Sequence, residues 1–283
     1  VLQYTMLQRA MAGAHRIFEV LDTEPEIIDP PNAVALSDIE GRVDFCDVNF
    51  SYIKGIPVLE KFDLHVSAGE TIALVGHTGA GKTSVTALVN RSYDIQEGEI
   101  LIDGHDLRSI QRASLTSRMS VVLQEPYLFS GSIRDNIRYG RLDATDEDVE
   151  IAAKAVGADD FISQLPSGYE TLLHERGRNV SVGQRQLIAF ARALVADPRI
   201  LILDEATANV DTQTEKIIQR ALETMLQGRT SFVIAHRLST IRNADRIVMM
   251  QSGKIVEIGD HDALMQHDGA YADLYRMTFA NAN

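Results

Sequence analysis

The sequence is poor in several features that would assign it to a class at once. It contains one cysteine, Cys46, so it has no pair for an intrachain disulfide, and a reducing compartment is the simpler interpretation. No apolar run approaches the roughly 20 residues that a membrane-spanning helix needs. Basic residues are few: 27 Lys and Arg stand against 40 Asp and Glu, a formal net charge of −13. This balance argues against a protein that binds nucleic-acid backbones, which usually presents a net basic face.

The overall composition is that of an ordinary globular protein. Of the 283 residues, 45% are hydrophobic and 24% are charged, which suits one large domain or two small ones. The acidic balance leaves free nucleotides open as ligands, because one local site is enough to bind them.

The first 32 residues predict a helix and a linker. Apolar residues recur at helical spacing from Leu2 to Leu21, and the chain starts at Val1 without a basic, signal-like beginning. The stretch DTEPEIIDPPN (22–32) is typical of a linker, because each proline disfavours helix in the residue before it. We expect residues 1–21 to be the end of a helix from something longer. The alternative is an amphipathic helix that docks on its own domain.

Strand patterns follow the linker. Two stretches within 42–66, RVDFCDVNFSY and VLEKFDLHV, predict two or three antiparallel strands. TIALV (71–75) is a continuous apolar run typical of a buried strand, and it leads into GHTGAGKT (76–83) and the helix-like run TSVTALVNRSY. This order of strand, glycine-rich loop and helix is the context that a P-loop requires.

The loop Gly76-x-x-x-x-Gly81-Lys82-Thr83 is the most specific signal in the chain. Its glycines let successive backbone N–H groups turn toward phosphate oxygens without side-chain clashes. Lys82 adds a positive charge for the β- and γ-phosphates, the helix N-terminus adds its dipole, and Thr83 offers a hydroxyl to Mg²⁺. The competing interpretation is a glycine-rich turn without a ligand.

A second apolar strand, which ends in two acidic residues, narrows the class of nucleotide-binding protein. In RILILDE (199–205), Asp204 ends a buried apolar strand and Glu205 follows it. An aspartate there can hold Mg²⁺ through water, and the next carboxylate can take a proton from an attacking water. Taken alone, the pair would also fit a solvated strand end. The chain has no NKxD guanine-reading motif, so a GTPase is less well supported than an ATPase or a kinase.

Five motifs in this order resemble the nucleotide-binding domain of an ABC transporter, over roughly residues 40–280. They are GHTGAGKT, Gln124 in VVLQEPYLF, VSVGQRQ, LILDEATANVD, and His236 in VIAHR. The strings LFSGSIRDNI and HERGRNVS are similar to exporters, of the multidrug or lipid type, rather than to importers. The resemblance implies a transmembrane partner domain, a second nucleotide-binding domain that is identical or different, the cytoplasmic face of the cell membrane as location, and no nucleic acid.

The resemblance also implies ATP and Mg²⁺ as ligands, together with a set of site residues. Those implied for catalysis are Lys82, Gln124, Glu205 and His236, and those implied for Mg²⁺ are Thr83, Gln124 and Asp204. Those implied for the nucleotide are Tyr52, Gly76, His77, Thr78, Gly79, Ala80, Gly81, Lys82, Thr83, Ser84, Ser181, Gly183, Gln184 and Asp211.

The resemblance implies a specific role for four of these residues. Tyr52 would stack on adenine, an interaction worth about 1–3 kcal/mol that tolerates any base. Gln124 would touch Mg²⁺ and the attacking water, and His236 would hold the γ-phosphate. Asp211 would couple the two sites of a dimer. Taken alone, Tyr52 would also fit an ordinary strand aromatic, and a lone histidine at a strand end such as His236 is more often structural.

The signature VSVGQ departs from the family's LSGGQ at Val180 and Val182. The resemblance implies that Ser181 binds the γ-phosphate of a second domain's ATP through its hydroxyl and through N–H groups at a helix N-terminus. A β-branched Val182 is tolerated if φ stays negative. The competing interpretation makes Ser181 a helix N-cap, and both roles can hold together.

The expected fold is α/β: a P-loop NTPase mixed-sheet core (about 42–123 and 197–260) with an antiparallel β subdomain and an inserted α-helical subdomain (about 124–196). We expect one division at 1–32 and 33–283, a helix start at Thr145–Asp148, and two short C-terminal helices separated at Asp268–Gly269. Two other functions stay open: a catalytically quiet regulatory domain of an asymmetric pair, and a soluble ATPase acting on DNA or ribosomes.

Overall fold

The computed structural model describes residues 2–36, 38–204, 212–235 and 237–279. Its strands are β1 (Val43–Phe50), β2 (Leu59–Val66), β3 (Thr71–Val75), β4 (Glu97–Ile102), β5 (His105–Asp106), β6 (Met119–Val122), β7 (Gly131–Ser132), β8 (Leu172–Leu173), β9 (Ile200–Asp204), β10 (Thr230–Ile234), β11 (Arg246–Gln251) and β12 (Lys254–Gly259). Its helices are α1 (Leu2–Leu21), α2 (Lys82–Val89), α3 (Arg112–Thr116), α4 (Ile133–Arg138), α5 (Asp146–Ala155), α6 (Asp159–Ile162), α7 (Val182–Val195), α8 (Thr212–Leu226), α9 (Leu238–Asn243), α10 (His261–His267) and α11 (Ala270–Phe279).

Two sheets organise the molecule. The larger has the strand order β12-β11-β3-β10-β9-β6, parallel throughout except for the antiparallel pair β11 and β12. The smaller, β2-β1-β4-β5, is antiparallel. This arrangement confirms the predicted α/β class, with a mixed-sheet core and an antiparallel β part. The strands predicted within 42–66, at 71–75 and within 199–205 are β1, β2, β3 and β9.

The central strands divide their side chains between two hydrophobic cores. In β3, Ile72 and Leu74 pack with the antiparallel sheet and α2, whereas Ala73 and Val75 pack with the helical layer. Phe232 of β10 belongs to the first core and its neighbour Val233 to the second. Because successive side chains of a strand point to opposite faces, a strand covered on both faces must be apolar at every position.

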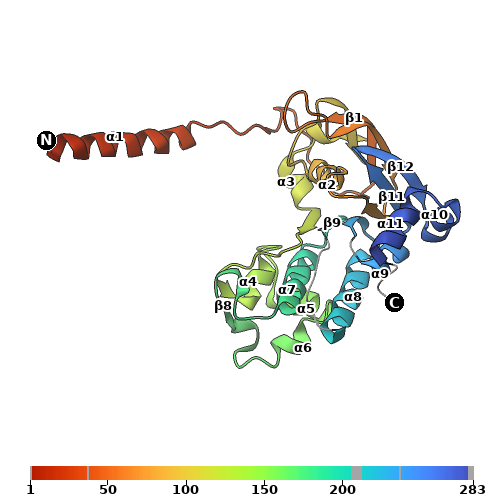
Figure 1. Cartoon of the computed structure of the whole chain (residues 1–283). Coiled ribbons are helices and arrows are strands. Elements are labelled where there is room, and N and C mark those ends of the chain that lie inside the picture. Colours follow the sequence, from red (N-terminus) through yellow and green to blue (C-terminus); the bar gives the residue numbers. More distant parts are fainter. Residues whose placement is uncertain (1, 37, 205–211, 236, 280–283) are drawn as a thin grey trace.

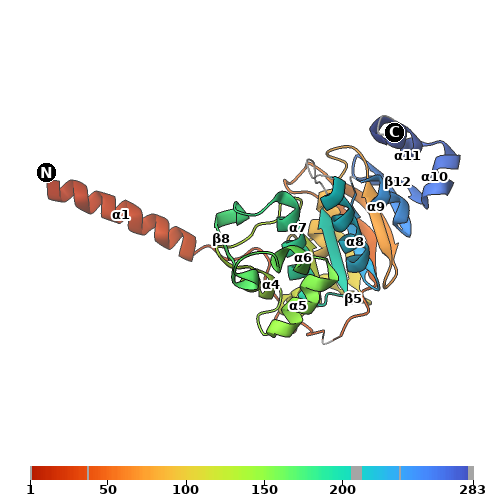
Figure 2. The ribbon, with the colours of Figure 1, turned by 90° about the horizontal axis from the view of Figure 1, so that it is seen from below.

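Figure 1 shows a strand-rich lobe above a helical lobe. The antiparallel sheet, α2 and α3 lie in the first, and α4–α7 lie in the second, where α7 packs against α4, α5 and α8. Figure 2 shows the molecule from below, with α10 and α11 on the opposite side of the compact body from β8. Helices α4–α7 all fall inside the predicted insertion of residues 124–196. The boundaries at 1–32 and 33–283 stay predictions.

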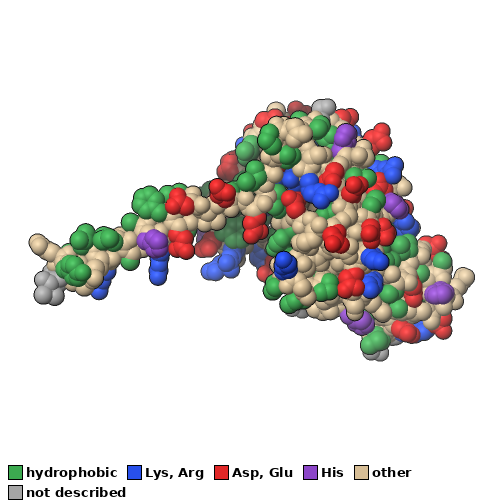
Figure 3. Space-filling view, turned by 90° about the horizontal axis from the view of Figure 1, so that it is seen from above, with side chains coloured by type: hydrophobic (Ala, Val, Ile, Leu, Met, Phe, Trp, Pro, Cys, Tyr) green, Lys and Arg blue, Asp and Glu red, His purple; other side chains and the backbone are tan. Residues whose placement is uncertain are grey.

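Helix α1 corresponds to the helix predicted for residues 1–21, and it projects away from the body instead of docking on it (Figure 1). Apolar side chains lie along its surface in Figure 3. The large exposed ones are Tyr4, Met6, Leu7, Met11, Ile17, Phe18, Val20 and Leu21. Across the described ranges, we find no helix that combines the length and the apolar character needed to cross a bilayer.

Helix ends follow their local sequence. Thr145 caps α5, because its hydroxyl accepts from the Asp148 N–H while Asp148 accepts from the Thr145 N–H. The two C-terminal helices are separated at Asp268 and Gly269, as predicted. Helix α2 is shorter than the run TSVTALVNRSY suggests: it ends at Val89, and Arg91 has a left-handed φ of 48°, which a continuing helix does not allow.

Candidate active site

The P-loop joins β3 to α2, and its backbone requires glycine at two positions. Gly76 has a φ of 147°, and a Cβ there would lie 2.3 Å from the carbonyl oxygen of Met250. Gly81 has a φ of 102°, and a Cβ there would lie 2.9 Å from a methyl carbon of Leu59. Gly79 also has a positive φ, 82°, but it faces open space. Only glycine satisfies these requirements together.

The turn between β11 and β12 supports the loop from behind. The Gly253 N–H donates to the Ala80 carbonyl oxygen at 3.1 Å. Met250, Gln251 and Ser252 line a cavity of about 230 Å³ together with P-loop residues 77–80. The sequence does not predict this contact. The Ser-Gly pair indicates a hairpin, but only the parallel pairing of β11 with β3 places that hairpin beside the P-loop.

Lys82 lies over the loop that precedes it. Its ammonium donates to the carbonyl oxygens of Gly76 at 2.7 Å and His77 at 3.1 Å. Burial lowers the pKa of Lys82 below its ordinary value, and the carboxylate of Asp204 partly offsets this by favouring the charged form. The structure thus brings Lys82 and Asp204 close enough to interact, although their motifs are more than a hundred residues apart.

The N-terminus of α2 is suited to a phosphate. Its N-cap is Gly81, which has no side chain, so no cap hydrogen bond forms there. The first N–H groups of a helix have no intrahelical partners and carry the positive end of its dipole. With Lys82 and open space at Gly79 beside them, these donors form the cradle that a polyphosphate requires. Thr83 is exposed at the same end, whereas Ala80 and Ser84 are buried.

The acidic and amide candidates lie at the same sheet edge as the P-loop. In the parallel register, Ile234 pairs with both Leu74 and Asp204, and Leu203 pairs with Val122. Asp204 is half-buried, and Gln124 is exposed two residues beyond the end of β6. Parallel strands place their carboxyl ends at one edge, where ligands bind in such sheets. The predicted site residues Glu205, Asp211 and His236 lie outside the described residues.

Tyr52 stands beside the P-loop helix. Its hydroxyl donates to Ser84 Oγ at 3.0 Å, and its ring makes edge contacts with Phe50 and Tyr93, with centroids 4.8 and 4.9 Å apart. The side chain is about half exposed. One part of the ring is held by aromatic neighbours while a large part stays accessible to a base.

The signature lies in the helical lobe, at the start of α7. Ser181 is its N-cap: its hydroxyl accepts from the Gln184 N–H at 3.2 Å, and the Gln184 side chain accepts from the Ser181 N–H at 2.9 Å. Ser181 and Val182 are exposed, and Gly183 is buried. Val182 is the first helical residue and is absent from the positive-φ positions, which meets the condition for valine there. In the described part of the chain, no hydrogen bond or ion pair joins these residues to the P-loop.

Comparison with protein-family models settles the family. Residues 59–208 match the model described as ABC transporter. The chain belongs to the ABC transporter family. It is an ATP-binding domain of the ABC type, the class of ATPases that the ordered motifs indicated.

Relatives of this ABC domain are close in sequence. It is 51% identical over 277 residues to an uncharacterised ABC transporter ATP-binding protein of Bacillus subtilis (strain 168), covering 98% of this chain and 46% of that protein. It is 49% identical over 271 residues to an ATP-dependent lipid A-core flippase of Desulfotalea psychrophila, covering 96% of this chain and 47% of that protein.

A solved structure agrees with the fold. The bacterial Atm1-family ABC exporter with ATP bound superposes with a TM-score of 0.88 at 39% sequence identity, covering 97% of this chain and 48% of that chain. The ABC domain described here therefore spans about half the length of the relatives and of the exporter chain that it matches.

Proposed function

We propose that this chain is the ATP-binding and ATP-hydrolysing domain of an ABC exporter, and that two such domains close on ATP to drive export across a membrane. The observation that carries the proposal is the P-loop geometry, in which Lys82, the bare N-terminus of α2 and Asp204 converge at one sheet edge. The names of the matched flippase and exporter support a transport role.

Each residue has a definite task in the proposed reaction. Backbone N–H groups of residues 77–83 and the Lys82 ammonium neutralise the phosphates, which matters most as charge develops in the transition state. Glu205 takes the proton of the attacking water or orients that water, and His236 holds the γ-phosphate. Asp211 links the two sites of the closed pair.

Three candidate residues at the sheet edge have oxygen atoms suited to Mg²⁺. Mg²⁺ is usually held by one or two protein ligands together with substrate phosphates and waters. Thr83, Gln124 and Asp204 would hold it, and when bound it would stabilise negative charge on the phosphates.

A groove between the lobes suits the transmembrane partner. A cavity of about 340 Å³ lies between β6, the loop after Gln124, the turn that follows α4, and helix α7, and Tyr127, Phe129 and Tyr139 line it. Arg192 of α7 lies over Phe129 and Tyr139 and donates to the Tyr127 carbonyl oxygen at 2.8 Å. A transmembrane domain seated here would move both Gln124 and the signature helix. We propose that residues 1–32 are the cytosolic helix end and linker that lead to such a domain, at the cytoplasmic face of the membrane.

The second nucleotide-binding domain completes the site. Ser181 is exposed at a helix N-terminus and is not joined to the P-loop of its own chain, so it is free to meet a γ-phosphate bound by a partner domain. A catalytically quiet regulatory domain is the alternative, and the presence of Glu205 and His236 weighs against it.

The mass of the Glu205→Gln protein in solution tests the proposal, measured by sedimentation with and without ATP–Mg²⁺. This change should stop hydrolysis while keeping ATP bound, so we expect an ATP-dependent shift from monomer to dimer, and phosphate release that is lost relative to the native chain. A Glu223→Gln variant, altered at an exposed position of α8, is the matched control and should keep native turnover. Unchanged turnover in Glu205→Gln would overturn the catalytic role.

A further inference from the structure

The chain at the end of the predicted linker and just after it, residues 29–36, is docked on the strand-rich lobe. The Val34 N–H donates to the Ser109 carbonyl oxygen at 2.8 Å, and the Val34 carbonyl oxygen accepts from the Gln111 N–H at 2.9 Å. Val34 and Ile110 form a parallel β-bridge. The Leu36 N–H donates to Ser114 Oγ at 3.2 Å. Residues 29–36, the docked segment, thus belong to the packing of the domain, whereas α1 projects from it.

One buried arginine joins this docked segment to the nucleotide site. Arg91 lies two residues after the end of the P-loop helix α2, and its side chain is only 2% exposed. Its guanidinium contacts Asp29 of the docked segment at 3.3 Å and Asp94 at 3.2 Å. It also donates to the carbonyl oxygens of Ile110 at 2.9 Å and Arg108 at 3.2 Å. A buried charge needs such partners, and removing one leaves part of that charge uncompensated.

Asp29 has a second partner that fixes its place. Its two carboxylate oxygens accept from the Arg112 N–H, the first of α3, at 3.2 and 3.0 Å. One carboxylate of the docked segment therefore bridges the turn after α2 and the start of α3. The left-handed φ of Arg91, 48°, is a conformation that a bulky residue keeps only where its surroundings hold it.

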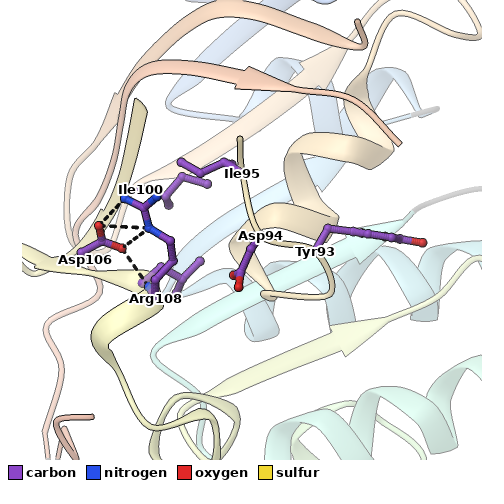
Figure 4. Close-up of a pocket in the computed structure, with 7 residues that line it drawn as sticks. Tyr93, Asp94, Ile95, Ile100, Asp106 and Arg108 are labelled. Atoms are coloured by element: carbon purple, nitrogen blue, oxygen red, sulfur yellow. Dashed lines mark hydrogen bonds and ion pairs between the residues drawn. The ribbon is translucent and has the colours of Figure 1, made fainter. Parts of the chain in front are cut away.

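The same turn carries Tyr93, which together with Tyr52 forms the surface on which a base would stack, the base platform. Asp94 follows Tyr93, whose ring makes an edge contact with Tyr52 at 4.9 Å between centroids. Figure 4 shows Asp94 between the Tyr93 ring and the Asp106–Arg108 ion pair. A cavity of about 240 Å³ is lined by Tyr52, Tyr93 and Asp94, and also by Glu26 and Ile27 of the linker. The linker, the turn and the platform therefore share one surface.

We propose that Asp29 and Arg91 are positioning residues for the nucleotide base. Their ion pair holds the turn that carries Tyr93 against Tyr52, so that docking of residues 29–36 and stacking of the base favour each other. The inference rests on the proposed function, because it requires that a nucleotide stacks on Tyr52. Coupling between two sites is reciprocal: whatever nucleotide binding does to the docking of this segment, docking does to nucleotide affinity.

The decisive experiment compares two ligands in the full 283-residue chain. ADP–Mg²⁺ engages both the P-loop and the base platform, whereas inorganic tripolyphosphate with Mg²⁺ engages the P-loop alone. We expect Asp29→Asn to raise the dissociation constant for ADP about fivefold or more and to leave that for tripolyphosphate unchanged. Asp29→Glu, which keeps the charge, should restore part of the ADP affinity. Glu24→Gln, an exposed change in the same linker, should alter neither constant.

A measurement on the native chain avoids the danger that a variant does not fold. Amide hydrogen exchange at Val34 and Gln111 should slow about fivefold or more with ADP and stay unchanged with tripolyphosphate. Equal effects with both ligands, or none with either, would overturn the inference and leave the proposed function standing. Failure of the native chain to bind ADP at all would overturn both.

Discussion

Two helix N-termini in this chain are expected to meet phosphate, and they are built in opposite ways. Helix α2 begins after Gly81, which has no side chain and a left-handed φ, so its first N–H groups have no cap of their own. Helix α7 begins after Ser181, and a reciprocal pair of hydrogen bonds with Gln184 closes that end. The N–H groups at the start of α2 are therefore available to a ligand bound by the same chain. At the start of α7, Ser181 and Gln184 already satisfy each other's N–H groups without a ligand.

The difference teaches what each end must do in the absence of ligand. The P-loop is held in place by its surroundings, through Gly253 behind it and the Lys82 ammonium across it, so it can leave donors unpaired. In the signature, Val180 and Gly183 are buried and Arg185 donates to the Val180 carbonyl oxygen at 2.9 Å, whereas Ser181 and Val182 are exposed. A capping box stabilises this exposed helix end. Ser181 can then serve a phosphate only in addition to, or in exchange for, its role as cap.

The largest expected effect comes from the uncapped end. Lys82→Ala removes a positive charge next to the phosphates and also the hydrogen bonds to Gly76 and His77. We expect ATP hydrolysis to fall by at least about 100-fold, the usual consequence of losing one transition-state charge stabiliser. Phosphate release measures it, with Lys216→Ala on the exposed face of α8 as control. Turnover within about twofold of the native chain would show that Lys82 is not needed.

The capped end offers a matched pair of variants. Ser181→Ala and Thr145→Ala each remove the same kind of capping box, at α7 and α5. Both should lower the free energy of unfolding by about 0.5–2 kcal/mol. If Ser181 also binds a partner's γ-phosphate, only Ser181→Ala should lower ATP hydrolysis, by about tenfold or more. Denaturant titration measures the effect on stability, and phosphate release measures the effect on hydrolysis. Equal turnover in both variants would show that Ser181 acts only as a helix cap.

The smallest effect concerns pH. Burial lowers the pKa of Lys82 in the folded chain below its ordinary value of 10.5. Below the lowered pKa the folded chain carries the full cost of the buried charge. As pH rises toward 10.5, Lys82 loses its proton in the folded chain before it does so in the unfolded chain. The free energy of unfolding therefore increases over this range. ADP affinity should fall over the same alkaline range, because the phosphates need the ammonium. Calorimetric titration checks this, and Lys82→Ala should show a flat affinity; a flat native profile would contradict the assignment.

Much of the site was predictable because its parts are short and local. Glycine spacing, one lysine and an apolar strand before them predicted the P-loop, and a serine just before a helix-like run allowed the competing interpretation of Ser181 as an N-cap. The docked segment was not predictable: a stretch with three prolines is typical of a linker, and nothing in DTEPEIIDPPN indicates that Asp29 meets a buried arginine. The support from Met250 and Gly253 was hidden for the same reason, since both contacts join residues far apart in the chain.

The sequence by itself determined the family of this protein and the candidate residues of its site, because a P-loop, an acidic strand end and a capped signature are each defined by residues within a few positions of one another. Tertiary structure decided how these parts meet. The order β3-β10-β9-β6 brings Lys82, Asp204 and Gln124 to one edge, while the two hydrophobic cores keep Ser181 in the other lobe. Strand order depends on how strands far apart in the chain pack against one another. Because their apolar sequences are similar, local sequence patterns do not indicate which strands pair.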